Sequence, residues 1–273
     1  MKQPIPSIAA VGRRTPMLDT ARGGVRTSEI FLSMASFRTA LLATAASALS
    51  LAAAPAALAN GLSFTNYTTG NSGLGSNSVQ GVYASGSNIY AATTGGLSIS
   101  TNGGSGFTNY TTTSGLGNNN VQGVYASGSN IYAATRGGGL SISTNGGSSF
   151  TNYTTTSGLG NNMVRGVYAS GSNIYAATRG GLSISTNGGS SFTNYTTTST
   201  NNGLGSNFVN GVYASGSNIY AATDGGLSIS TNGGSSFTNY TTTSTNNGLG
   251  NNLVYGVYAT PAAATSTPPP AAA

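Results

Sequence analysis

The 273-residue sequence contains no cysteine, no histidine and no tryptophan, and only 4% of its residues are charged. These absences exclude catalytic groups built on histidine or cysteine, a disulfide framework and zinc sites of the ordinary type. Acidic side chains are nearly absent as well, because Asp19, Glu29 and Asp224 are the three in the chain. Hydrolysis of a glycosidic bond usually requires two carboxylates, and a calcium site requires several. We therefore predict a protein that is not an enzyme and that holds neither a metal ion nor a cofactor.

The positive charge of the sequence is concentrated near its start. The formal net charge is +6, but only Arg136, Arg165 and Arg179 lie beyond residue 59, together with Asp224. A protein that binds the phosphate backbone of a nucleic acid needs a stripe of basic side chains. We therefore do not expect a nucleic acid to be a partner.

An uncharged, alanine-rich run at residues 39–59 follows Arg38 and ends in Ala57-Leu58-Ala59. A basic residue, an apolar run and a small-residue cleavage site together indicate a signal peptide of the bacterial Sec type, with cleavage before Asn60. An uncharged run of this length could also span a bilayer as an anchor. The abundance of alanine over leucine and the presence of Pro55 favour cleavage, so we expect no stable insertion in a membrane afterwards.

The two ends of the chain are expected to lie outside the folded domain. Signal peptides begin close to their basic residues, so Met34 is the expected start of translation, and residues 1–33 are interpreted as a gene-calling extension. The signal peptide then occupies residues 34–59. The Pro/Ala-rich residues 261–273 are expected to form a disordered tail. The mature protein is expected to be secreted, periplasmic or located at the cell surface.

Residues 60–260 consist of an internal repeat. The tripeptide Gly-Val-Tyr recurs at spacings of 42 to 45 residues, starting at Gly81, Gly123, Gly166, Gly211 and Gly256. Each unit contains four short runs rich in β-branched and aromatic residues, separated by Gly, Asn and Ser, a pattern typical of strands joined by turns. In the second unit the runs are 121–126, 130–135, 140–144 and 149–155. Apolar residues show no helical spacing, so a helical solenoid is excluded and an all-β fold is predicted.

Four strands in about 43 residues correspond to one blade of a β-propeller. The rungs of a parallel β-helix are shorter, and the turn Ser143-Thr144-Asn145-Gly146-Gly147 is typical of an antiparallel hairpin. The repeated segments Phe-Thr-Asn-Tyr-Thr-Thr and Asn-Ile-Tyr-Ala-Ala-Thr resemble the two-component regulator propeller repeat over residues 61–259. That repeat usually occurs in the periplasmic sensor halves of bacterial hybrid histidine kinases. The resemblance implies a β-propeller-like array of about four complete four-stranded blades and an incomplete closing blade.

The turn that follows the third run of each unit resembles a second propeller motif. Its sequence, Ser-Thr-Asn-Gly-Gly-Ser, is similar to the Asp box of sialidase-type propellers, also called the BNR repeat. Asparagine replaces the acidic residue of that box in all four copies, at Asn102, Asn145, Asn187 and Asn232. The resemblance implies that these residues form structural turns between the two outer strands.

The two ends of the repeat region do not make a complete unit. The region begins with a fourth run at residues 61–69 and ends with a first run at residues 253–260, so the second and third strands of a closing blade are missing. The two end strands could not hydrogen-bond to each other, and self-association through the open edges is therefore expected to be possible. Three interpretations stay open: a four-bladed ring with two spare strands, an open arc that completes itself by dimerising, and the truncated product of a larger gene.

The units are nearly identical, so the positions at which they differ indicate where a ligand binds. The differences concentrate beside the first valine of each unit and in the link between the second and third strands, which lie at the same end of a propeller blade. Free drift of loop residues would also produce variation, but the links at the other end have hardly changed. The candidate ligand-binding residues are Arg136, Met163, Arg165, Arg179, Phe208, Asn210, Asp224, Leu253 and Tyr255.

The chemistry of these candidates favours a carbohydrate. Phe208 and Tyr255 break the periodic pattern of aromatic residues, and we expect them to stack on a sugar ring. Arg136, Arg165 and Arg179 could hydrogen-bond a polyhydroxylated or anionic ligand. The sequence therefore predicts an exported, non-catalytic protein that binds a glycan or another small ligand on one face. The alternatives are a structural protein of the envelope or matrix that assembles with itself, and a fragment of a larger propeller sensor.

Overall fold

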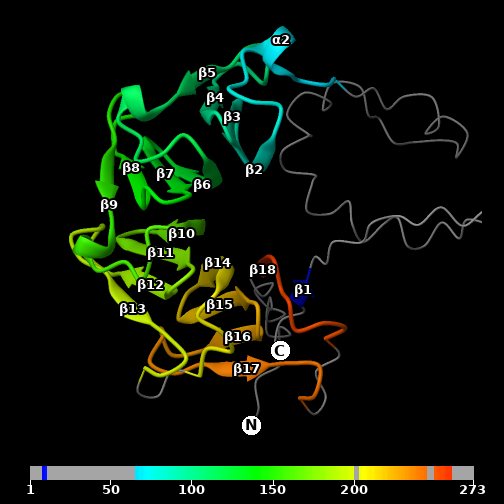
Figure 1. The fold of residues 1–273 in the computed structure, drawn as a ribbon, viewed down its shortest axis with the longest axis vertical. Helices are drawn as coiled ribbons and strands as arrows, with labels where there is room; N and C mark the ends of the chain where they lie inside the picture. Colours follow the sequence, from blue (N-terminus) through cyan, green and yellow to red (C-terminus); the bar gives the residue numbers. More distant parts are fainter. Residues whose placement is uncertain (1–7, 11–64, 200–202, 245–248, 260–273) are drawn as a thin grey trace, which may run out of the picture.

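The computed structural model describes residues 8–10, 65–199, 203–244 and 249–259 (Figure 1). The predicted extension, signal peptide and tail lie outside these residues, apart from residues 8–10. The strands are β1 (Ile8–Ala10), β2 (Val79–Ser85), β3 (Asn88–Thr93), β4 (Gly96–Ser100), β5 (Thr108–Tyr110), β6 (Val121–Ser127), β7 (Asn130–Thr135), β8 (Leu140–Ser143), β9 (Thr151–Tyr153), β10 (Val164–Ser170), β11 (Asn173–Thr178), β12 (Gly181–Ser185), β13 (Thr193–Tyr195), β14 (Val209–Ser215), β15 (Asn218–Thr223), β16 (Gly226–Ser230), β17 (Thr238–Tyr240) and β18 (Val257–Ala259). The helical turns are α2 (Thr69–Ser72) and the 3-10 turns η1 (Thr112–Ser114) and η2 (Thr155–Ser157). In this part of the chain no helix is long and apolar enough to cross a membrane.

The strands form four antiparallel sheets, in the orders β2-β3-β4-β5, β6-β7-β8-β9, β10-β11-β12-β13 and β14-β15-β16-β17. Each sheet is one repeat unit, and we name the sheets blades 1 to 4 in chain order. The blades stand side by side around an open arc, with the first strand of each blade on the inside and the fourth on the outside (Figure 1). The prediction of an all-β array with four complete four-stranded blades is confirmed.

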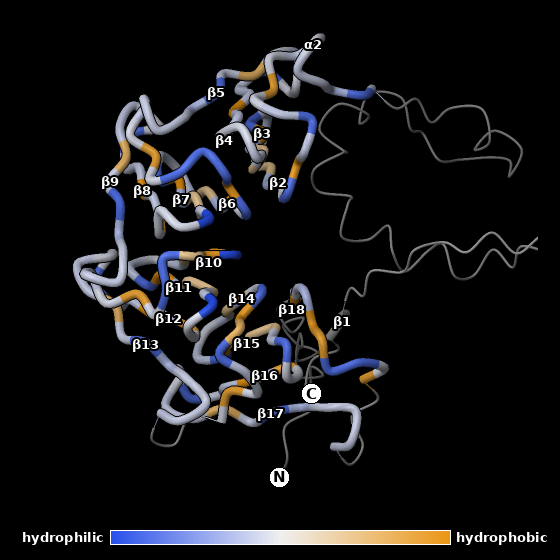
Figure 2. The backbone as a smooth tube through the Cα atoms, in the orientation of Figure 1, coloured by the Kyte–Doolittle hydropathy of each residue, from blue (hydrophilic) through white to orange (hydrophobic). Residues whose placement is uncertain are grey.

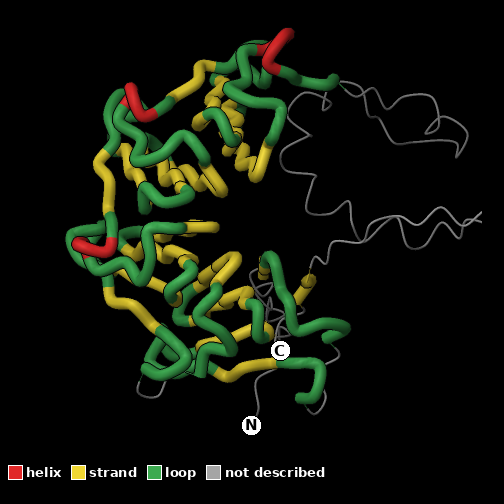
Figure 3. The backbone as a smooth tube through the Cα atoms, viewed as in Figure 1, coloured by secondary structure: helices red, strands yellow, loops and turns green. Residues whose placement is uncertain are grey.

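The observed strands follow the predicted runs closely, except that the fourth strand of each blade is short. In blade 2 the run predicted at residues 149–155 narrows to β9, because the chain leaves the sheet after Tyr153. Thr154 and Ser157 form a capping box around η2, in which the N–H of Thr154 donates to Ser157 Oγ at 3.3 Å and the N–H of Ser157 donates to the carbonyl oxygen of Thr154 at 2.9 Å. These short helical turns lie toward the outside of the arc (Figure 3).

The two incomplete ends of the array differ from the prediction. Residues 65–68, expected to continue a strand over 61–69, belong to no sheet, and α2 begins at Thr69. A fourth strand pairs with the third strand of its own blade, and the repeat pattern supplies no third strand before this segment. At the other end β18 is shorter than the predicted 253–260, and it pairs antiparallel with β1, with Ile8 opposite Ala259. The sequence analysis did not anticipate this pairing.

The second strand of an inner blade is buried on both faces because neighbouring blades cover it from two sides. In β7, Ile131 and Ala133 pack in the cluster shared with blade 1, whereas Tyr132 and Ala134 pack in the cluster shared with blade 3. Successive side chains of a strand point to opposite faces, so one strand supplies two cores. Figure 2 shows the hydrophobic residues in the strands and many of the hydrophilic residues in the turns. The segment Ile-Tyr-Ala-Ala, which is repeated in every second strand, therefore contributes to the cores on both sides of its blade.

A β-bulge in each first strand lets two valines face the same core. In blade 3 the pairing of β10 with β11 shifts between Val164 and Gly166, so that Arg165 is an extra residue. Val164 and Val167 consequently both pack against blade 2, although three positions separate them. The first strands of the other three blades show the same shift.

Two repeated glycine positions are required by the backbone. A Cβ atom on Gly123 would lie 2.9 Å from the carbonyl oxygen of Arg165, so a side chain there would push blades 2 and 3 apart. Gly128 has a φ of +59° and begins the two-residue link between β6 and β7. Two-residue hairpin links favour glycine because they need such a backbone conformation.

A row of tyrosines follows the inner strands from blade to blade, and we call it the tyrosine row. The ring centroids are 4.9 Å apart for Tyr83 and Tyr125, 4.9 Å for Tyr125 and Tyr168, 4.8 Å for Tyr168 and Tyr213, and 4.9 Å for Tyr213 and Tyr258. Each aromatic pair of this kind adds about 0.5–1.5 kcal/mol beyond the burial of its surface. The tyrosines of the inner strands therefore pack neighbouring blades against one another.

The asparagine of each box turn holds the turn through its side chain. In blade 3, Oδ1 of Asn187 accepts hydrogen bonds from Ser185 Oγ at 2.8 Å and from the N–H of Ser191 at 3.0 Å. Its Nδ2 donates to Ser191 Oγ at 2.9 Å. In blade 1 the residue equivalent to Ser191 is Gly106, which offers Asn102 a backbone N–H but no hydroxyl.

Replacement of Asn187 by alanine is expected to lower the free energy of unfolding by about 1–2 kcal/mol, because three hydrogen bonds of a largely exposed turn are lost. Asn102→Ala is the matched control and should cost less, because Gly106 leaves that turn without one of the three bonds. Urea denaturation followed by circular dichroism measures both values. Equal losses for the two variants would contradict the role given to the serine hydroxyl.

Candidate ligand-binding rim

Nearly all variable positions of the units lie at one end of the blades, and Gly106 in the box turn of blade 1 is an exception at the other end. In an antiparallel four-stranded blade, the link between the second and third strands and the link to the next blade lie at the same end. We call this end of the array the rim. Its variable residues are Ser78, Gln80, Thr94, Asn120, Gln122, Arg136, Met163, Arg165, Arg179, Phe208, Asn210, Asp224, Leu253 and Tyr255.

Within a blade, a backbone hydrogen bond joins the two kinds of variable residue. The N–H of Arg179 donates to the carbonyl oxygen of Met163 at 3.2 Å, and the N–H of Asp224 donates to that of Phe208 at 3.1 Å. The bulge then takes the residue after the valine, such as Arg165, out of the regular alternation of the strand. Residues 163 and 165 therefore do not follow the regular alternation in which strand residues two apart point to the same side.

Contacts between blades connect some of the predicted residues into a continuous row. Arg136 of blade 2 forms an isolated β-bridge with Met163 of blade 3. The guanidinium carbon of Arg179 in blade 3 lies 5.4 Å from the ring centre of Phe208 in blade 4. An exposed cation above an aromatic ring at this distance is stabilised by about 0.5–1 kcal/mol. The structure thus brings these four residues together across three blades.

Asn210 and Asp224 form a second group, which contacts the last unit. Nδ2 of Asn210 donates to Oδ1 of Asp224 at 2.7 Å and to the carbonyl oxygen of Val254 at 2.9 Å. Asn210 is 9% exposed, and both hydrogens of its amide are used in these bonds. Its side chain therefore joins blade 4 to the residues that lead into β18. Acidic side chains do not gather into a possible metal site in the part of the chain that the structure describes.

Exposure separates the predicted ligand residues into two groups. Phe208 is 47% exposed, Tyr255 is 46% exposed and Leu253 is 37% exposed, which is unusual for large apolar side chains. The arginines of the links between second and third strands are exposed as well. Met163 and Arg165 are half-buried. The accessible chemistry of the rim at blades 3 and 4 and the following unit is therefore aromatic and aliphatic, with cationic groups beside it.

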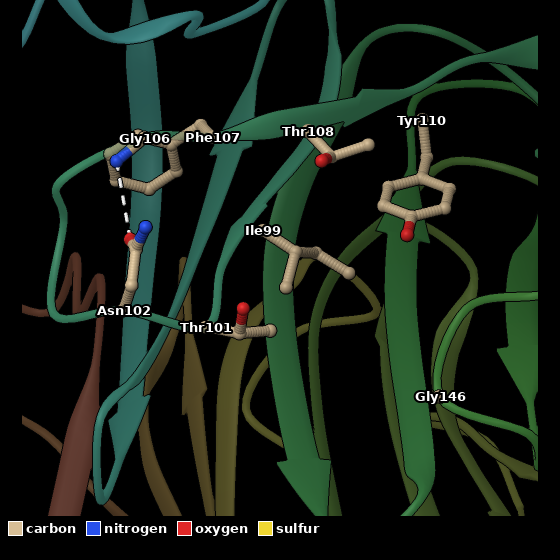
Figure 4. A pocket seen from close by; sticks show the side chains of 8 residues that line it. All are labelled: Ile99, Thr101, Asn102, Gly106, Phe107, Thr108, Tyr110 and Gly146. Carbon is tan, nitrogen blue, oxygen red and sulfur yellow. Dashed lines mark hydrogen bonds between the residues drawn. The ribbon is translucent and has the colours of Figure 1, made fainter.

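A hollow of about 350 Å³ lies away from the rim, at the box turn of blade 1 (Figure 4). Gly106 occupies the position of a serine in the other turns, and its N–H donates to Oδ1 of Asn102 at 3.2 Å. Tyr110 of blade 1 and Gly146 of blade 2 also line the space. Gly106 is a visible departure from the repeat, but the sequence analysis assigned it no role.

Solved structures with a similar arrangement of strands bear on the fold. The extracellular domain of a protein described as the hybrid two-component system BT3049 of B. thetaiotaomicron matches with a TM-score of 0.52 and 21% identity, over 66% of this chain and 24% of that chain. The extracellular domain of BT4673 from the same organism matches with a TM-score of 0.53 and 18% identity, over 66% and 24%. The fold is that of a β-propeller-like blade array. The predicted resemblance to sensor propellers is therefore supported at the level of the fold.

The same comparisons limit what can be carried over. This chain spans about a quarter of the length of the two sensor domains. An ancestral GH74 enzyme also matches, with a TM-score of 0.48 and 23% identity over 61% of this chain and 24% of that chain. No protein-family profile and no curated protein matches the sequence. At these identities the solved structures establish the blade array and not a ligand.

Proposed function

We propose that this protein is an exported, non-catalytic binding module that holds a carbohydrate on the rim. The observation that carries the proposal is the coincidence of sequence variation with exposed aromatic surface. Phe208 and Tyr255 are each nearly half exposed, whereas the periodic tyrosines of the second strands, such as Tyr175 and Tyr220, are buried at 4% and 3% exposure. Phe208 and Tyr255 are thus aromatic residues that depart from the repeat and also meet solvent.

The side chains of the rim suit a sugar by their chemistry. The face of an aromatic ring packs against the C–H groups of a sugar ring, and a planar guanidinium donates several hydrogen bonds to hydroxyl groups. Arg179 already lies against the ring of Phe208, so a cationic donor and an aromatic face occupy one place. Export is supported by the extracellular location of the two sensor domains to which the chain is similar.

The proposal excludes hydrolysis of the bound sugar. Asp224 is the single carboxylate side chain beyond residue 59, and it accepts a hydrogen bond from Asn210 at 2.7 Å. A glycosidase of the usual kind needs a second carboxylate at a defined distance to act as nucleophile or base. Incubation with a bound oligosaccharide should therefore return it uncleaved.

The test is the affinity of the protein for a panel of oligosaccharides, first by thermal shift and then by calorimetry. A ligand at 100 times its dissociation constant should add about 2.7 kcal/mol of stability. The triple variant Arg165→Ala, Phe208→Ala, Tyr255→Ala is expected to bind the selected oligosaccharide at least about tenfold more weakly, a loss of about 1.4 kcal/mol. Its melting temperature without ligand should change little, because both aromatic rings are already half exposed.

Tyr258→Ala is the matched control for this experiment. Tyr258 is 52% exposed, similar to Tyr255, but it lies on an inner strand and belongs to the tyrosine row. Its replacement should leave the affinity for the oligosaccharide unchanged. A melting temperature that no oligosaccharide shifts, or equal losses of affinity in the control and the triple variant, would refute the proposal.

A further inference from the structure

Blade 1 exposes a surface that is buried in the other three blades. We call it the leading face, the side of β2 and β3 that points away from blade 2. Its apolar residues are Val79, Val82, Ala84 and Ile89. The valine that begins the first strand is 0% exposed in blades 2, 3 and 4, at Val121, Val164 and Val209, whereas Val79 is 42% exposed.

The exposure arises from position in the array and not from sequence. Val82 is 60% exposed, whereas its counterparts Val124, Val167 and Val212 pack against the cores that their blades share with the preceding blade. All four copies have a valine at both positions. A contiguous apolar surface of this kind on a soluble protein is typical of a surface that meets a partner.

The tyrosine row shows what chemistry continues the array at each end. Tyr125, Tyr168 and Tyr213 each have a ring neighbour on both sides, at 4.8–4.9 Å. In the described part of the chain, Tyr83 has a row neighbour only toward blade 2, and Tyr258 has one only toward blade 4. Tyr83 therefore has a free side on which a preceding tyrosine of the row would pack, and Tyr258 has a free side on which a following one would pack.

The outer edge of blade 1 already holds part of a preceding unit. The ring of Tyr67 lies 5.9 Å from that of Phe107 in an edge-to-face arrangement. The same contact joins blade 1 to blade 2, where Tyr110 and Phe150 are 6.1 Å apart. A unit assembled against the leading face would thus combine parts of two copies. Its outer aromatic residue would be Tyr67 of the copy that carries the leading face, and its inner strand would be β18 of the other copy. Figure 1 shows β2 and β18 on opposite sides of the opening of the arc.

We propose that the protein associates head to tail, with β18 of one copy seated on the leading face of a second copy. The ring of Tyr258 then packs against the ring of Tyr83 in the next copy, in the geometry that neighbouring tyrosines of the row have within one chain. Neither β2, β3 nor β18 contains a charged residue, so no charge is buried by the contact. Because the two surfaces differ, the contact is heterologous, and it produces rings where it closes and filaments where it does not. The rim residues of blades 2 and 3, Arg136, Met163 and Arg179 among them, lie away from this contact.

Two charge variants test the polarity of the contact. Val82→Glu blocks the leading face and should not lower the melting temperature of the monomer, because Val82 is 60% exposed. Tyr258→Glu blocks the other end and should lower it only slightly, because the side chain is 52% exposed and the variant loses one ring contact, with Tyr213. Each protein is expressed from the complete coding sequence, purified in the form that accumulates, and examined by light scattering over a range of concentrations. The unaltered protein is expected to form oligomers and each variant alone to be monomeric. An equimolar mixture of the two variants should form dimers and nothing larger, because each dimer has one working contact and two blocked ends.

Ser127→Glu is the matched control, because it places the same charge on an exposed first-strand residue of blade 2, whose equivalent face is covered. It should associate as the unaltered protein does. Dimers of Tyr258→Glu alone would indicate a contact between two leading faces and would overturn the head-to-tail arrangement. A monomeric unaltered protein at all concentrations, or a mixture of the two variants that stays monomeric, would overturn it as well.

Discussion

Replacing Leu182 with alanine is expected to lower the free energy of unfolding by about 2–5 kcal/mol. Leu182 is 0% exposed and lies in the core between blades 3 and 4, together with Val209 and Phe237. Alanine would leave a cavity that β12 cannot close, because the strand is hydrogen-bonded on both sides. Packed interiors relax only partly around such a cavity, so the cost exceeds the loss of buried surface alone.

Leu253→Ala is the control for this substitution, since Leu253 is 37% exposed at the rim and should change stability by no more than about 0.5 kcal/mol. Urea denaturation observed by circular dichroism and by tyrosine fluorescence measures both variants. Coincident transitions in the two signals show whether the four blades unfold as one unit, which a single free energy requires. Similar losses in Leu182→Ala and Leu253→Ala would mean that the blades are not held by the cores between them.

Thermal stability is expected to be nearly constant from about pH 5 to pH 9 and to fall steeply between about pH 10 and pH 12. The plateau follows from composition, because the sequence has no histidine or cysteine and Asp224 is the single acidic side chain beyond residue 59. The alkaline limit follows from the tyrosine row. Burial raises the pKa of Tyr213 to about 12, and repulsion by the phenolates of Tyr168 and Tyr258 adds to the effect. Burial also raises the pKa of Tyr83 and Tyr125.

The direction of the change follows from proton binding. Below pH 10 these tyrosines are protonated in both the folded and the unfolded chain, so their contribution to stability is fully present. Above pH 10 the unfolded chain releases the protons while the folded chain retains them, which favours unfolding progressively as the pH rises through the folded pKa. Melting temperatures measured across this range, with the absorbance of tyrosinate as a second signal, test the prediction. Tyr213→Phe should weaken the alkaline loss, and a transition that begins near neutral pH would contradict the assignment.

Most of the blade array could be predicted because its signals are local. The runs of β-branched residues, the glycine that starts the link between β6 and β7, and the box turn around Asn145 each specify a short segment without reference to distant residues. Each of these local signals occurs in all four units. The fourth strands were predicted too long because the capping box around η2 competes with the sheet for the residues that follow Tyr153.

The candidate site was predictable in its location but not in its contacts. Differences between copies placed Phe208 and Arg179 at one end of the blades, and the structure brings the ring and the guanidinium to 5.4 Å. The same differences suggested a ligand role for Asn210, whose amide the structure instead engages with Asp224 and Val254. A change of residue type shows where the copies diverge, but it does not show whether the new side chain meets solvent or a neighbouring unit.

The sequence by itself determined the number of complete units, the strand order and the turns, because these depend on residues close together in the chain. Only the tertiary structure determined which residues are buried and which strands are paired at the two ends of the repeat region. Val79 and Val209 occupy the same place in the same motif, yet one is 42% exposed and the other is 0% exposed. The burial of a strand in this array depends on the blade beside it, and at the ends of a repeat that neighbour must come from elsewhere.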